Sequence, residues 1–334
     1  MSQSKEIMQA AIYHQFGKAK EVIEVREVEK PEPQEGQIRV KLFCAGVNPS
    51  DIKMRSGTSR PLTGNWQIPS SDGAGIVDAI GPGVDRFKIG QRVWVFNAAF
   101  MRPQGTSSEY TVIESWMASS LPDHLSYVQG ACLGIPVMTA HRCLFSDGPI
   151  DGKTVMISGG AGVVAHYAIQ LAKWGGARVI TTVSSDLKAQ HAKAAGADCI
   201  INYRTENVVE RVLSWTEQVG VDRVLEVDFG ANLTTNAQIL KPGGVNVMYA
   251  VVDQPALPLP VPMMMAKNII LRFTLIYTIT PSERAQILSD IDTWLNTGKC
   301  QFAIAAKFPL KDVVQAHELI ESGNKIGHVI LEID

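Results

Sequence analysis

Residues 154–176, TVMISGGAGVVAHYAIQLAKWGG, restrict the possible folds more than any other stretch of this chain. A β-branched run over 154–158 ends in glycines, and an apolar helical pattern follows at once. The register from Gly160 to Ala165 matches the G-x-G-x-x-G/A fingerprint of a dinucleotide-binding turn between a strand and a helix. An ordinary strand-to-helix turn in a parallel sheet is the alternative interpretation.

Each small residue of this turn has a steric reason to be there. Gly160 allows the tight turn, Gly162 lets the backbone approach a pyrophosphate, and Ala165 lets helix and strand pack closely. The helix dipole and the unpaired N–H groups of the helix N-terminus then favour phosphates. Val163 would crowd the pyrophosphate if its side chain faced the ligand. The residues expected to contact the nucleotide here are Gly159, Gly160, Ala161, Gly162, Val163 and Val164.

Strand and helix patterns alternate regularly from about residue 130 onward. Strands are predicted over 154–158, 178–183, 199–203, 223–227 and 245–250. Helices are predicted between them, over 163–174, 187–195, 206–219 and 231–240. Because parallel strands need crossover helices, this alternation predicts an α/β fold with a doubly wound parallel sheet.

The N-terminal part of the chain has a different, β-rich pattern. Alternating runs such as IRVKLFCAGV and QRVWVF are separated by Gly, Pro, Asn and Asp turns. After Pro281 come a helix, a strand, a helix and a final strand, which have no place in the central series and are expected to return to the N-terminal domain. The 334 residues suit two domains. The predicted boundaries are 1–128 with 282–334 for one domain and 129–281 for the other.

Charge and cysteine usage exclude several classes of function. The net charge of −2 leaves no basic surface typical of nucleic-acid binding, so a nucleic-acid partner is not expected. We expect neither a targeting segment nor a membrane span, because no sufficiently long apolar run occurs. The five widely spaced cysteines contain no C-x-x-C, which indicates reduced thiols in a cytoplasmic protein without a local cysteine zinc cluster.

Several collinear segments resemble one superfamily along nearly the whole chain. They include GVNPSDIKMRSG, DGAGIVDAIGPGVDRFKIGQRVW, QGACLGIPVMTAHRCL and SGGAGVVAHYAIQLAKWGGARVI. The pattern is similar to the medium-chain dehydrogenase/reductase superfamily, and most of all to its zinc-free quinone oxidoreductase (zeta-crystallin-like) branch. The resemblance implies a GroES-like β-rich catalytic domain, a Rossmann cofactor domain, NADPH as cofactor and hydride reduction of quinones or related conjugated carbonyls.

Two zinc ligands of the related alcohol dehydrogenases have no counterparts here. Asn48 stands where those enzymes have a cysteine, and Ser71 stands where they have a histidine. A catalytic zinc needs about three Cys, His or acidic ligands, so no metal is expected. Without a Lewis acid, an acceptor that delocalises the incoming charge is the easier substrate, which favours quinones and enones over simple ketones.

The resemblance places Asn48 and Asp51 in the loop that walls the substrate cleft, and Lys53 where several quinone reductases have a tyrosine. Asn48 would donate a hydrogen bond to the substrate oxygen, or it would close an Asx-turn in N-P-S-D. A proton-donating role for Lys53 would require partial desolvation, and a solvated surface lysine is the alternative.

Cofactor choice depends on the end of the second central strand, where NAD needs a carboxylate and NADP needs cations. The strand ends on serines, and Asp186 is displaced toward a helix that it would cap. Lys188 and Tyr203-Arg204 match positions that contact the 2′-phosphate in NADPH-using relatives. Together with Ser184 at the strand end, they predict NADPH.

The resemblance also implies positions nearer the reacting end of the cofactor. Thr139 matches a residue beside the nicotinamide, and Tyr249, Phe273 and Leu275 match segments that close over the cofactor. The segment NIILRFTLI matches the family's subunit-joining edge strand, so a homodimer is expected to cover this edge.

Two other functions stay open from the sequence. One is an enoyl-thioester or other alkene reductase, because the NPSDI loop is shared with such enzymes, although residues 57–60 lack their tyrosine. The other is a non-catalytic NADPH-binding protein. Turnover with quinones, with enoyl thioesters or with neither acceptor separates the three functions.

Overall fold

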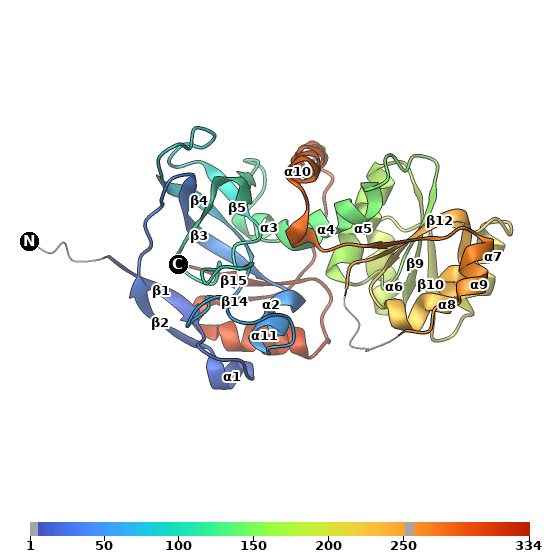
Figure 1. Ribbon diagram of the computed structural model, residues 1–334, viewed down its shortest axis with the longest axis horizontal. Coiled ribbons are helices and arrows are strands. Elements are labelled where there is room, and N and C mark those ends of the chain that lie inside the picture. The colour runs from blue at the N-terminus through green and yellow to red at the C-terminus, as the bar shows by residue number, and fades with distance from the viewer. Residues whose placement is uncertain (1–5, 251–256) are drawn as a thin grey trace, which may run out of the picture. The chain divides into compact units, whose positions relative to one another are not determined.

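The computed structural model describes residues 6–250 and 257–334 of the chain, shown in Figure 1. It divides into two compact units, Met1–Ile135 with Phe302–Asp334 and Pro136–Gln301. The boundary after Ile135 falls inside helix α4 (Gly134–Phe145). Within the described ranges, no helix is long and apolar enough to cross a membrane.

The first unit is built on a seven-stranded sheet with the order β14-β15-β3-β4-β5-β7, and β6 also pairs with β3. The strands are β3 (Gln37–Val47), β4 (Asp72–Ile80), β5 (Arg92–Val95), β6 (Tyr110–Glu114), β7 (Ala118–Ser120), β14 (Ile304–Pro309) and β15 (His328–Glu332). A separate antiparallel hairpin joins β1 (Ile7–Ile12) to β2 (Glu24–Glu29). The helices of this unit are α1 (Ala19–Val22), α2 (Pro49–Arg55), α3 (Tyr127–Gly130) and α11 (Val313–Glu321).

The core of the first unit explains why the C-terminal segment packs with the N-terminal part of the chain. Ile38, Val40 and Leu42 alternate along β3, so their side chains share one face of the sheet and are fully buried. Val313 and Ala316 of α11 belong to the same core cluster. Strand β15 pairs antiparallel with β3, which adds backbone hydrogen bonds to this apolar contact.

The second unit holds a six-stranded sheet in which every pairing is parallel. Its order is β10-β9-β8-β11-β12-β13. The strands are β8 (Thr154–Ile157), β9 (Arg178–Val183), β10 (Cys199–Asn202), β11 (Val221–Glu226), β12 (Leu240–Met248) and β13 (Ile270–Phe273). The helices are α5 (Val163–Trp174), α6 (Asp186–Ala194), α7 (Val208–Trp215), α8 (Phe229–Ile239), α9 (Val261–Ala266) and α10 (Pro281–Leu295). The predicted doubly wound parallel sheet is confirmed.

The chain reverses direction across this sheet between β8 and β11. From β8 it runs outward to β9 and β10, and from β11 it runs outward the other way to β12 and β13. Right-handed crossovers therefore place α5 on one face of the sheet and α8 on the other, as Figure 1 shows. Ligands of such sheets bind at this reversal point, beyond the carboxyl ends of the strands.

Helix α10 belongs to the second unit, which differs from the predicted boundary at residue 282. Its apolar face buries Ile287, Ile291 and Trp294, and Trp294 meets Tyr167 of α5 edge-to-face with ring centroids 6.2 Å apart. Only the strands and helix after Gln301 join the first unit. The helical pattern of α10 is local, whereas its packing partners are distant in sequence, so the sequence did not show where it docks.

None of the five cysteines, all of which lie in described residues, takes part in a disulfide. Cys44, Cys132, Cys143 and Cys199 are buried, and Cys300 is half-buried. Burial raises the pKa of Cys44 and of Cys143 to about 12, and that of Cys300 to about 11. These side chains therefore remain thiols at neutral pH.

Candidate functional site

The glycine turn lies directly beyond β8, at the reversal point of the sheet. Gly159, immediately before the expected motif, has φ of +68° and is the residue that takes the left-handed conformation of the tight turn. The sequence assigned that turn to Gly160. Gly160 is instead required for close packing, because a Cβ there would lie 2.3 Å from Thr181 Oγ1.

Hydrogen bonds hold this loop against β9 and leave its outer side open. Gly159 N donates to Thr182 Oγ1 at 3.1 Å, and Gly160 N donates to the Thr182 carbonyl at 2.9 Å. Gly162 is the N-cap residue of α5 and is exposed, while Val163 and Val164 are half-buried in the first turn. Ala161 and Ala165 are buried. The N-terminus of α5 is thus available to an anion.

A cavity of about 340 Å³ opens beside the loop at the carboxyl ends of four strands. Ser158 and Gly159 follow β8, Thr182 is the penultimate residue of β9, and Val227 follows β11. Tyr203, directly after β10, forms another part of the wall and is 52% exposed. This position and size suit the base and ribose of a bound nucleotide.

The end of β9 carries the groups predicted to select the cofactor. Lys188 Nζ donates to Ser184 Oγ at 3.0 Å, so a cation and a hydroxyl converge there. Ser185, rather than Asp186, caps α6, because its hydroxyl accepts from Lys188 N at 3.4 Å. Asp186 is exposed as the first residue of that helix. The expected capping role of Asp186 was therefore wrong.

Glu226, at the end of β11, is a residue that the sequence analysis did not single out. Its carboxyl group is fully buried and accepts four hydrogen bonds. Oε2 accepts from Ser158 Oγ and Asn236 Nδ2, both at 2.8 Å, and Oε1 accepts from Asp228 N at 2.7 Å and Asn232 Nδ2 at 3.0 Å. Since Ser158 precedes Gly159, this network fixes the base of the glycine turn to β11 and α8.

The remaining predicted cofactor residues are also in the second unit. Thr139 is buried within α4, and Tyr249 lies just beyond β12 with its backbone N–H bonded to the Glu226 carbonyl at 3.3 Å. Burial raises the pKa of the Tyr249 hydroxyl. Phe273 and Leu275 are 76% and 54% exposed at the outer edge of the sheet, away from the packed core.

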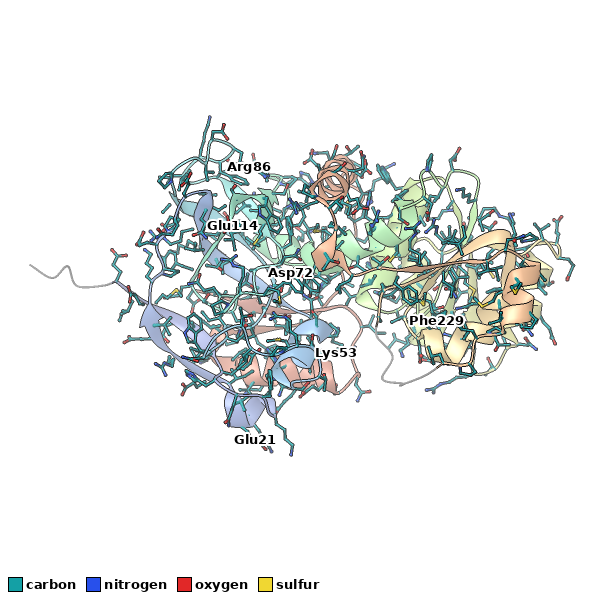
Figure 2. The ribbon with its side chains drawn as sticks, viewed as in Figure 1. Glu21, Lys53, Asp72, Arg86, Glu114 and Phe229 are labelled. Atoms are coloured by element: carbon teal, nitrogen blue, oxygen red, sulfur yellow. The ribbon has the colours of Figure 1, made fainter. Side chains whose placement is uncertain are left out.

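In the first unit, α2 brings Asn48, Asp51 and Asp72 together, and Figure 2 labels Asp72 and Lys53. Asn48, the N-cap residue, donates its backbone N–H to Asp51 Oδ2 at 2.7 Å and its side-chain Nδ2 to Asp72 Oδ2 at 2.7 Å. Both carboxyl groups are buried. One hydrogen of the Asn48 amide is thus committed within the protein, instead of being held for a substrate.

The environment of the two carboxyl groups favours their protonated forms. Burial raises the pKa of Asp51 to about 7, even though the Asn48 N–H and Arg60 oppose this shift. Burial also raises the pKa of Asp72, and the charge of Asp51 adds to that effect. Lys53, on the outer side of α2, is exposed, so it lacks the desolvation that a proton-donating lysine needs.

Asp72 also fixes the start of α4. Ile135 N lies 3.0 Å from both of its carboxylate oxygens, and a Cβ at Gly134 would lie 2.0 Å from Asp72 Oδ1. The residue at 134 must therefore be glycine. The sequence contains no local signal for the Asn48–Asp72 contact, because the partners are 24 residues apart.

Comparison with known proteins gives one family match in each of the two units. Residues 34–123 match the family described as alcohol dehydrogenase GroES-like domain, and residues 163–292 match zinc-binding dehydrogenase. The chain is 29% identical to quinone oxidoreductase of Rattus norvegicus over 334 residues, covering 99% of each protein. The solved Escherichia coli quinone oxidoreductase complexed with NADPH superimposes with a TM-score of 0.86 at 28% identity, covering 97% of this chain and 99% of that one.

A further similarity is to a short stretch of a much larger protein. The chain is 29% identical, over 318 residues, to a phenolphthiocerol/phthiocerol polyketide synthase of Mycobacterium tuberculosis, which covers 94% of this chain and 14% of that protein. Fold, nucleotide loop and similarities together define an oxidoreductase. The chain belongs to the medium-chain dehydrogenase/reductase superfamily, in its quinone oxidoreductase branch.

Proposed function

We propose that the protein uses NADPH to reduce quinones or related conjugated carbonyls by hydride transfer, without a metal. The observation that carries this proposal is the open glycine turn at the sheet reversal with Lys188 and Ser184 nearby. The NADPH complex of the Escherichia coli relative supports the same cofactor. When bound, NADPH supplies the hydride. Residues 159–164 would hold its pyrophosphate, and Ser184, Lys188 and Tyr203 would contact its 2′-phosphate.

The side chains of the first unit that could serve as metal ligands support a reaction without zinc. A catalytic zinc needs about three Cys, His or acidic ligands. Across residues 6–250 and 257–334, no group of three or more such side chains is placed to hold a metal ion. The Asn48 side chain donates a hydrogen bond to Asp72, and both residues are buried.

We assign the proton that accompanies the hydride to Asp51. Reduction of a quinone or another conjugated carbonyl adds one hydride and one proton to the substrate. A group that is protonated near neutral pH is needed to supply that proton. Asp51, with its pKa raised to about 7, fits that requirement. Asn48 orients Asp51 through its backbone N–H.

The direct test follows the oxidation of NADPH and NADH with 1,4-benzoquinone, 9,10-phenanthrenequinone and crotonyl-CoA, with and without a chelator. We expect chelator-insensitive oxidation of NADPH by a quinone. Loss of activity with the chelator would contradict the metal-free reaction. Turnover of crotonyl-CoA alone would favour a second candidate, enoyl-thioester reduction, which the similarity to the polyketide synthase supports.

Replacing Lys188 with alanine tests cofactor selection. Removing a cation that faces a phosphate costs about one charge-assisted hydrogen bond, so KM for NADPH should rise about tenfold or more while KM for NADH stays unchanged. Lys193→Ala, an exposed lysine on the same helix, is the matched control. Equal changes in the two KM values would contradict the assignment of Lys188 to the 2′-phosphate.

We also propose that the protein is a homodimer joined through β13. Within the described residues, β13 pairs only with β12, and Ile270 and Phe273 expose apolar surface along its outer edge. Such an edge is normally covered. Phe273→Lys should convert a dimer to a monomer in sedimentation velocity, whereas Ile89→Lys, at an exposed apolar residue of the first unit, should not. A wild-type monomer would refute this proposal.

A further inference from the structure

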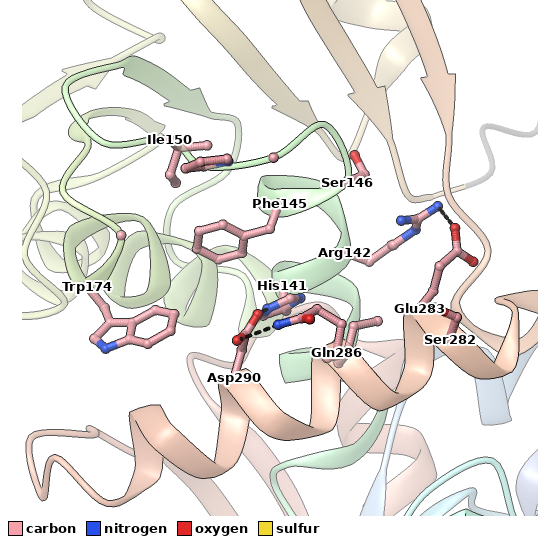
Figure 3. Close-up of a pocket in the computed structure, with 14 residues that line it drawn as sticks. His141, Arg142, Phe145, Ser146, Ile150, Trp174, Ser282, Glu283, Gln286 and Asp290 are labelled. Atoms are coloured by element: carbon pink, nitrogen blue, oxygen red, sulfur yellow. Dashed lines mark hydrogen bonds and ion pairs between the residues drawn. The ribbon is translucent and has the colours of Figure 1, made fainter.

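A second cavity lies in the second unit, apart from the nucleotide loop. It has a volume of about 600 Å³, within the range of small-molecule sites. Figure 3 shows its walls, which come from α4, the loop after α4, the C-terminal end of α5 and one face of α10. Among the described residues, none lines both this cavity and the one at the glycine turn.

One side of the cavity is aromatic and apolar. Phe145 and Trp174 meet edge-to-face with ring centroids 6.0 Å apart, and Trp174 is 38% exposed. Ile150 and Ile287 extend the same surface. Aromatic rings at such spacing offer faces and edges on which a flat ring can pack. An exposed tryptophan face also attracts a cation.

The polar side carries two carboxylates with different partners. Glu283 is paired with the guanidinium of Arg142, so its charge is balanced. Asp290 accepts from Gln286 Nε2 at 2.9 Å and contacts His141 Nε2 at 2.8 Å. Burial lowers the pKa of His141, which favours the neutral imidazole beside Asp290. Asp290 therefore leaves the cavity with a net negative charge.

We propose that this cavity binds a small organic cation with a flat apolar body. Its ring would pack against Phe145 and Trp174, and its ammonium group would lie toward Asp290. A neutral or anionic molecule of the same shape would lack the attraction to this carboxylate. The site is separate from the nucleotide loop, so its occupancy does not depend on the proposed reaction.

The test compares three probes of one shape: 1-naphthylmethylammonium, 1-naphthylmethanol and 1-naphthoate. Each is titrated into the full chain by isothermal calorimetry, with and without saturating NADPH. We expect saturable binding of the ammonium probe, unaffected by NADPH, and weaker binding of the other two by about tenfold, as expected for loss of one charged hydrogen bond. Equal affinities, absence of binding or competition with NADPH would each overturn the proposal.

Three variants locate the binding. Asp290→Asn should weaken binding of the ammonium probe about tenfold, by the same loss of a charged hydrogen bond. It should leave the affinity for the alcohol unchanged. Trp174→Leu should weaken the binding of both the ammonium probe and the alcohol. Asp292→Asn, at an exposed carboxylate on the same helix outside the cavity, is the matched control and should change neither affinity. Equal effects of Asp290→Asn and Asp292→Asn would refute a specific role for Asp290.

Discussion

Replacing Asp51 with asparagine should lower kcat by about 10²- to 10⁴-fold, the range typical for loss of a general acid. The side chain keeps its shape and an oxygen that can accept from Asn48 N, so the start of α2 is preserved. The variant loses only the proton. Steady-state rates with a quinone and saturating NADPH measure the effect.

The pH profile should identify the same residue. With a pKa of about 7, Asp51 is protonated below that pH, so wild-type kcat should fall about tenfold per pH unit above 7. Asp51→Asn should lose this limb. Asp123→Asn, at a fully exposed carboxylate of the same unit, should keep the wild-type profile. An active Asp51→Asn enzyme with an unchanged profile would make Asp51 a helix cap only.

The pH dependence of stability distinguishes a catalytic role of Asp51 from a role in folding. The folded-state pKa of about 7 lies above the ordinary value of 3.8, so the folded protein holds this proton more tightly than the unfolded chain. Wild-type stability therefore falls as pH rises from about 4 to 7, through this group. Asp51→Asn has no such dependence and should unfold at the same or a higher temperature above pH 7. Reduced activity without reduced stability would confirm a chemical role.

Removing the buried carboxylate of Glu226 should have the largest effect on stability. Glu226→Ala leaves four buried donors without their acceptor, and since one such donor costs about 1–3 kcal/mol, the free energy of unfolding should fall by about 3 kcal/mol or more. Glu226→Gln keeps the shape but turns an NH₂ group toward two donors, so we expect a loss of about 1–3 kcal/mol. Urea unfolding monitored by tryptophan fluorescence gives both values.

The same glutamine variant should also weaken cofactor binding. Ser158, one of the four donors, directly precedes the turn at Gly159, so a displaced Ser158 should raise KM for NADPH more than it lowers kcat. Glu217→Gln, exposed in the same unit, should stay within about 0.5 kcal/mol of wild type. A Glu226→Gln protein with wild-type stability and KM would show that the network does not fix the loop.

The local parts of this structure are those that the sequence predicts well. Helix α5 and strand β9 begin and end at the predicted residues, because their caps, glycines and apolar periods lie within each segment. Strand β12 begins earlier than predicted and includes Pro242, Gly243 and Gly244, which local propensity excludes. An irregular register with β11 accommodates them.

The parts that depend on distant contacts are those that the sequence could not reveal. The carboxyl group of Asp72, in β4, accepts from Asn48 at the start of α2. Glu226 accepts from Ser158, which follows β8, and from Asn236 of α8. Neither residue belongs to a motif with a fixed spacing. Their importance comes from burial, which only the folded chain creates.

The buried cysteines have a consequence for the proposed reduction of quinones. Quinones are electrophiles that add to thiolates, so a protein that binds them repeatedly is at risk of covalent modification by its own substrate. With Cys44 and Cys143 buried and their pKa values at about 12, almost no thiolate is present to react. Burial and a raised pKa thus disfavour arylation of these two thiols, which is compatible with the proposed quinone substrates.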